Sequence, residues 1–129
     1  MSKKKKKSTE LEKRVEYFTA KVRFYQDALG LRDWELFVGS EDFEDRGRCY
    51  PNIQGKICTI TVGEEWLESK DTTYPEIDRI AFHEVLEMML APMTCEMTRY
   101  YADRYVEVMT HDIIQRLTNM IYGSDQLDV

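Results

Sequence analysis

The two histidines of the chain, His83 and His111, are the side chains best suited to metal chemistry. His83 opens a His-Glu-Val-Leu-Glu stretch that ends at Glu87. Residues four apart in a helix share one face and lie about 6 Å apart along the axis, so His83 and Glu87 can reach one ion. Glu84 is rotated by about 100° from His83, which suits a general base acting on a water near the ion. Imidazole and carboxylate groups both bind zinc.

The surrounding helix pattern favours an enclosed site. Its apolar positions extend around most of the helix: Ile77, Ala81, Phe82, Val85, Leu86, Met88 and Met89. A helix that is apolar over so much of its surface is largely buried, and charged groups within it need partners or a metal ion. The alternative is that His83, Glu84 and Glu87 form only the solvated edge of an amphipathic helix.

The same stretch resembles the HExxH helix of small zinc metallopeptidases, most closely the short SprT-like and phage-encoded members. Their motif helix continues into a hydrophobic run that ends in Ala-Pro, as it does here at Ala91-Pro92. The hairpin from Cys49 to Val62 resembles the edge strands of that family, and Trp34 resembles the start of its first strand. The resemblance covers most of residues 9–122. It implies a minimal zincin: a peptidase with one zinc ion and a metal-bound water.

The chain departs from that family at one position, because Glu87 stands where the family has its second motif histidine. Members of the family often carry a Glu or His shortly before a pair of branched residues on the last helix, and His111 occupies a similar place. The resemblance therefore implies His83, Glu87 and His111 as metal ligands, with two ligands exchanged. Glu107 remains open as the alternative third ligand, in which case His111 is an exposed histidine.

The order of the expected elements is one helix, three strands and two helices, which favours an α+β fold of the zincin type over an alternating one. The sheet is expected to be small, three-stranded, and antiparallel or mixed. The expected elements are helices over 9–29, 75–90 and 98–122, strands over 33–39, 48–53 and 56–62, and a helical turn at 64–67.

Glycine and proline mark the expected boundaries of these elements. Gly30 suits a left-handed cap after the first helix. Pro51 predicts that the second strand lies at an edge, and Pro92 is expected to end the motif helix. The apolar face of the last helix is expected to contain Ala102, Val106, Met109, Ile113, Leu117 and Met120.

The 129 residues suit a single domain, expected over 9–124, with a disordered basic tail at 1–8 and a short tail at 125–129. No run approaches the ~20 apolar residues of a membrane span. Lys3–Lys7 are not followed by an apolar segment, so no signal peptide is expected and the predicted location is the cytoplasm, of the host if the chain is phage-encoded. The three cysteines, Cys49, Cys58 and Cys95, are expected to be reduced thiols in or near the core.

Charge limits the classes of partner. The net charge is −6 although five lysines cluster at Lys3–Lys7, so a broad nucleic-acid face is not expected. The lysine run could make weak, non-specific contacts with phosphates. The preferred hypothesis is a zinc-dependent hydrolase of proteins or peptides that binds its substrate along an edge strand. The alternatives are a non-catalytic, phage-type binding or accessory protein on the same scaffold, and a structural metal site with four protein ligands.

Overall fold

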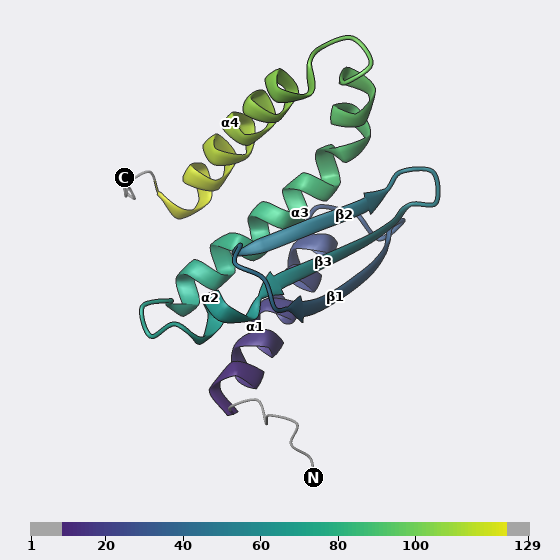
Figure 1. The fold of residues 1–129 in the computed structure, drawn as a ribbon. Coiled ribbons are helices and arrows are strands. Elements are labelled where there is room, and N and C mark those ends of the chain that lie inside the picture. Colours follow the sequence, from purple (N-terminus) through teal and green to yellow (C-terminus); the bar gives the residue numbers. More distant parts are fainter. Residues whose placement is uncertain (1–8, 124–129) are drawn as a thin grey trace.

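The computed structural model describes residues 9–123, so the tails predicted at 1–8 and 125–129 lie outside the described residues. The fold is α+β in the predicted order of elements (Figure 1). The observed elements are α1 (Thr9–Ala28), β1 (Glu35–Glu41), β2 (Gly47–Asn52), β3 (Ile57–Gly63), α2 (Glu64–Glu68), α3 (Tyr74–Met97) and α4 (Asp103–Tyr122).

The sheet is mixed, with strand order β1-β3-β2. The central strand β3 pairs in parallel with β1 and antiparallel with β2, which places Cys49 opposite Ile60. β2 is an edge strand, as Pro51 predicts, because proline has no N–H to donate to a second neighbour. β1 begins two residues later than expected and continues through Ser40 and Glu41, beyond the expected end at residue 39.

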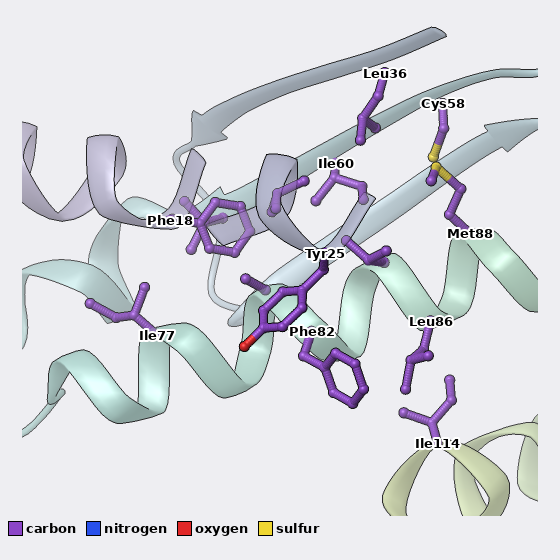
Figure 2. Packing of buried hydrophobic residues seen from close by; sticks show 14 of the residues in the cluster. Phe18, Tyr25, Leu36, Cys58, Ile60, Ile77, Phe82, Leu86, Met88 and Ile114 are labelled. Carbon is purple, nitrogen blue, oxygen red and sulfur yellow. The ribbon is translucent and has the colours of Figure 1, made fainter. Parts of the chain in front are cut away.

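The core lies between the sheet and the two long helices α1 and α3. Figure 1 shows both helices on the same face of the sheet, and Figure 2 shows their buried side chains converging. Phe18 from α1, Ile60 from β3 and Leu86 from α3 are almost fully buried. Burying large apolar side chains from three elements fixes the rotation of α3, and with it the direction of the side chains on its other faces.

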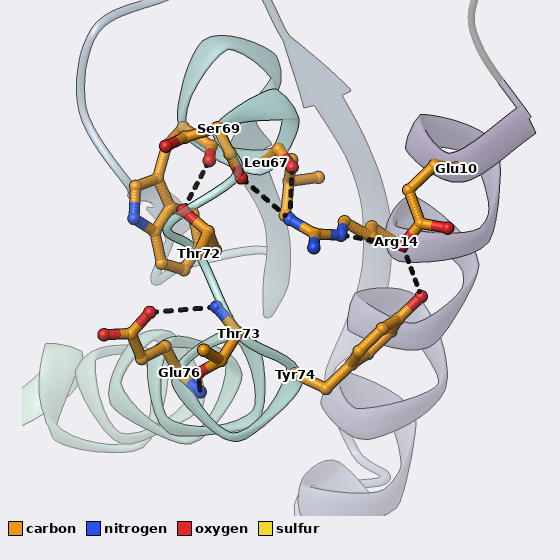
Figure 3. Close-up of polar contacts among 9 residues, drawn as sticks. Glu10, Arg14, Leu67, Ser69, Thr72, Thr73, Tyr74 and Glu76 are labelled. Atoms are coloured by element: carbon orange, nitrogen blue, oxygen red, sulfur yellow. Dashed lines mark hydrogen bonds and ion pairs between the residues drawn. The ribbon is translucent and has the colours of Figure 1, made fainter.

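The start of α3 is fixed by a capping box. Thr73 Oγ1 accepts a hydrogen bond from Glu76 N at 3.3 Å, and Glu76 Oε1 accepts one from Thr73 N at 3.0 Å. Figure 3 shows that α1 also holds this region: Arg14 Nη1 donates to the Leu67 carbonyl at 2.7 Å, and the Tyr74 hydroxyl donates to Glu10 at 3.1 Å. The Arg14 contact ties α1 to α2, and the Tyr74 contact ties α1 to the start of α3.

The predicted end of α3 is wrong. The helix does not stop before Pro92 but continues through it to Met97. Proline removes only one helical hydrogen bond, and burial of neighbouring residues can offset the lost stability. Ala91, next to Pro92, is buried here. The next helix consequently begins at Asp103 and not at residue 98, after a turn in which Tyr101 N donates to the Met97 carbonyl at 3.0 Å.

The predicted inward face of α4 is only partly right: Val106 is buried as expected and Leu117 packs against the core, but the other predicted positions do not face inward. The buried residues are Val106, Ile114 and Thr118, whereas Met109, Ile113 and Met120 are exposed. The helix is thus rotated by roughly 80° from the expected orientation. Threonine can be buried here because its hydroxyl is satisfied within the helix: Thr118 Oγ1 donates to the Ile114 carbonyl at 2.7 Å. An apolar pattern alone does not detect such positions.

Two further expectations concern membranes and thiols. None of the helices in the described region has the length and apolar character that crossing a bilayer requires.

All three cysteines are free. Cys58 is buried and Cys49 is partly buried, but Cys95 is exposed near the end of α3, so the expected core position is wrong for Cys95.

Candidate metal centre

A cavity of about 640 Å³ lies along α3, between the beginning of β2 and the middle of α4. Figure 1 shows α3 running between these two elements. The residues that carry polar atoms into the cavity come from all three elements, and they include every predicted site residue: His83, Glu84, Glu87, Glu107 and His111.

His83, Glu87 and His111 converge at one point of this cavity. The Glu87 carboxylate oxygen Oε2 lies 3.0 Å from His83 Nε2 and 3.3 Å from His111 Nε2. One ligand atom from each of the three residues lies within 4.8 Å of the others. The four-residue spacing on α3 brings His83 and Glu87 together, and the packing of α4 supplies His111.

The convergence affects the ionisation of Glu87. Burial raises the pKa of this carboxyl, but the hydrogen bonds and charges of His83 and His111 outweigh it and hold the pKa below its ordinary value. Glu87 is therefore a carboxylate facing two imidazole nitrogens. The His83 and Glu87 side chains are 28% and 31% exposed, so the group is partly shielded from water but open on one side.

The donor set fits zinc. Two imidazole nitrogens and one carboxylate oxygen form a common set of protein ligands at catalytic zinc sites, which keep a further position open. Bonds of about 2.0–2.1 Å in a tetrahedron place neighbouring ligand atoms about 3.3 Å apart. The separations of 3.0 Å and 3.3 Å at Glu87 Oε2 match that spacing. The ligand atoms of the two histidines lie within 4.8 Å of each other, so a small movement of the imidazoles would complete the set.

Glu107 lines the same cavity but does not belong to the converging group. It lies one turn before His111 on α4. The observed rotation of α4 brings both side chains to this cavity, which we call the groove. The apolar face expected from the sequence would have turned His111 away from α3. Of the two candidates for the third ligand, the geometry favours His111.

Glu84 occupies an unusual position for a carboxyl group. The residue is only 5% exposed, and no hydrogen bond or ion pair joins its carboxyl to another group within residues 9–123. Burial and the nearby charge of Glu87 raise its pKa to about 8. A buried polar group without a partner is costly and rare, so this carboxyl points to a ligand or water that binds beside it.

Gly47 makes room for that carboxyl. An added Cβ at Gly47 would lie 3.0 Å from Glu84 Oε2 and 3.1 Å from Ile80 Cγ2. The backbone of β2 thus passes directly over the Glu84 side chain. Gly47 was not among the predicted site residues; the signal in the sequence is a glycine at the start of an edge strand beside a predicted site.

Cys49 also lines the cavity, although it was not a predicted site residue. Its Sγ lies 3.5 Å from Cys58 Sγ across the β2–β3 pair. The contact with Cys58 and burial raise the pKa of the Cys49 thiol, so it stays protonated. A neutral thiol is a poor metal ligand, which agrees with its absence from the converging group.

Comparison of the chain with family models, with curated proteins and with solved structures finds no match. The resemblance to SprT-like metallopeptidases therefore stays a prediction made from the sequence.

Proposed function

We propose that the chain is a metal-dependent peptidase of the minimal zincin type, which binds zinc through His83, Glu87 and His111. The observation that carries the proposal is the buried Glu84 carboxyl, which has no partner in the described fold and lies beside a His-Glu-His set. A structural zinc site requires ligands but no neighbouring base, whereas a hydrolytic site requires both.

Glu84 has the properties of the general base. Zinc held by such a set supplies a water whose pKa is lowered to about 7. In the metal-free chain the pKa of the Glu84 carboxyl is about 8. A zinc cation beside it would lower that pKa toward neutrality and favour the carboxylate, which is the form that accepts a proton. Glu84 would accept the proton of the attacking water and deliver it to the leaving amine, and its buried setting would keep the proton from bulk solvent.

The edge strand β2 supports a peptide as the substrate. Residues 45–50 line the cavity, and β2 pairs with β3 on one side only. Its second row of backbone N–H and C=O groups is therefore available to an extended chain, which would add to the sheet as a further strand. A peptide bound in this way would pass across the His83-Glu87-His111 group.

The Glu84→Gln variant tests the proposal. Glutamine keeps the size of the side chain but cannot accept a proton, so the variant should retain zinc and lose 100-fold or more of its peptidase turnover, on the order of a general-base effect. The assay is cleavage of a mixed peptide library, followed by mass spectrometry, with zinc content measured on the same samples. Glu107→Gln serves as the matched control, because Glu107 lines the cavity outside the converging group.

Two results would count against the proposal. Zinc bound without cleavage of any library peptide by the wild-type chain would indicate a structural or binding site on the same scaffold. Equal turnover in the Glu84→Gln variant and the wild-type chain would remove Glu84 from the mechanism.

A further inference from the structure

The groove continues beyond the candidate metal centre, toward the N-terminus of α3. A second hollow of about 610 Å³ shares four residues with the central cavity: Arg46, Arg79, Ile80 and Gln115. Arg79 lies one helical turn before His83, on the same face and about 6 Å away along the axis. A substrate group next to the reacting bond would therefore reach this arginine.

Arg46 and Arg79 differ from Arg48, the third arginine of the central cavity. Arg48 Nε forms an ion pair with Asp45 Oδ2 at 3.0 Å. Within residues 9–123, no carboxylate forms an ion pair with Arg46 or Arg79. Their guanidinium carbons lie over aromatic rings, 5.8 Å from the Trp66 centroid and 5.1 Å from the Tyr122 centroid. The rings orient the two cations without neutralising them.

The other end of the groove has the opposite charge. A hollow of about 320 Å³ shares Glu87, Glu107 and His111 with the central cavity, and its remaining lining includes Asp103 but no arginine or lysine. At the arginine end the only acidic lining residue within 9–123 is Glu76, whose carboxylate already accepts the Thr73 N–H of the helix cap. The groove thus changes from basic to acidic across the His83-Glu87-His111 group.

We propose that the arginine end binds a carboxylate of the substrate, so that the groove prefers peptides with an acidic group on the side of the α3 N-terminus. The planar guanidinium group pairs with a carboxylate through two parallel hydrogen bonds, which gives both affinity and direction. Either an Asp or Glu side chain or a free C-terminal carboxylate offers this chemistry. The inference rests on the proposed function only for the existence of a reacting bond, because carboxylate binding itself needs no metal.

The test is equilibrium binding to the full chain after chelation of metal. The probes are a fluorescein-labelled, C-terminally amidated peptide with Glu at alternate positions, its Gln-for-Glu counterpart, and the Gln peptide with a free C-terminal carboxylate. At equal ionic strength the Glu peptide should bind about tenfold or more tightly than the amidated Gln peptide. Equally tight binding of the free-acid Gln peptide would show that the site accepts either source of carboxylate. Tight binding of that peptide with weak binding of the Glu peptide would assign the site to the C-terminal carboxylate.

Variants distinguish this site from general attraction of charge. The double variant Arg46→Gln/Arg79→Gln should abolish the preference for a carboxylate. Arg99→Gln should keep it, because Arg99 pairs with Glu96 and lies outside the groove. Equal binding of all three peptides, or a preference that survives the double variant, would overturn the inference. Because zinc is absent from this measurement, it can fail while zinc-dependent turnover holds, and it can succeed while turnover fails.

Discussion

Burying a carboxyl group without a hydrogen bond destabilises a fold, and Glu84 bears that cost in the centre of the groove. Its neighbour Glu87 has the reverse setting, since two imidazoles hold it ionised. The two carboxyl groups are three residues apart on one helix, yet their environments move their pKa values in opposite directions. This division between a ligand and a base is the residue-scale basis of the proposed chemistry.

The pH dependence of stability tests the setting of Glu84 in the metal-free chain. The carboxyl loses its proton near pH 4.5 in the unfolded chain and at about 8 in the fold. Between these values unfolding releases a proton, so this group's contribution to the free energy of unfolding falls as pH rises. Glu84→Gln removes that loss. As pH rises across this range, the free energy of unfolding of the variant should therefore increase relative to that of the wild-type chain by about 2–4 kcal/mol.

Urea denaturation of both proteins at a series of pH values, in the presence of a chelator, measures the difference. Other titrating groups are common to the two proteins and cancel to first order. Parallel curves for the free energy of unfolding against pH would show that Glu84 ionises normally in the fold.

At the scale of elements, β2 packs against Glu84, the proposed base. Gly47→Ala would push a methyl group against Glu84 and Ile80, both on α3. The variant should lose about 1–3 kcal/mol of stability, as overpacked sites do, together with most of its turnover. Thermal unfolding and the library cleavage assay give the two readings.

Gly39→Ala is the matched control, because Gly39 lies in a strand of the same sheet and an added Cβ there meets nothing within 4 Å. It should have turnover close to that of the wild-type chain. Equal loss of activity in the two variants would mean that Gly47 has no specific role in making room for Glu84.

The sequence predicted the elements better than their boundaries. The three- and four-residue spacing of apolar positions was sufficient for α1, and Pro51 correctly placed β2 at an edge. Pro92 was misleading, because packing around Ala91 outweighs the loss of one helical hydrogen bond. The capping box of Thr73 and Glu76 starts α3 at Tyr74, one residue before the expected start at residue 75.

At the scale of the whole molecule, the site is made by the packing of α4 on α3. His83 and Glu87 could be paired from their spacing alone, but His111 joins them only because α4 turns Val106, Ile114 and Thr118 inward. The burial of threonine is decided by hydrogen bonds to the helix backbone, which no hydrophobic pattern encodes. For Gly47 the sequence offered only its place at the start of an edge strand, and its contact with Glu84 depends on β2 passing over α3.

Ile114→Ala tests this dependence on α4. Ile114 is fully buried between the two helices, and its truncation should cost about 2–5 kcal/mol. Because His111 is carried by the same helix, zinc affinity should fall about tenfold or more although every ligand is retained. Met120→Ala, at a side chain that is 75% exposed, should change neither quantity. Zinc affinity that is unchanged in Ile114→Ala would mean that α4 does not position a ligand.

The most direct measurement is the zinc content and zinc affinity of the chain purified without a histidine tag. The account predicts one zinc ion for each wild-type chain, loss of that ion in His83→Ala and in His111→Ala, and its retention in Glu107→Gln. A wild-type chain that takes up no zinc, or a His111→Ala variant that binds it as tightly as the wild-type chain, would contradict the account.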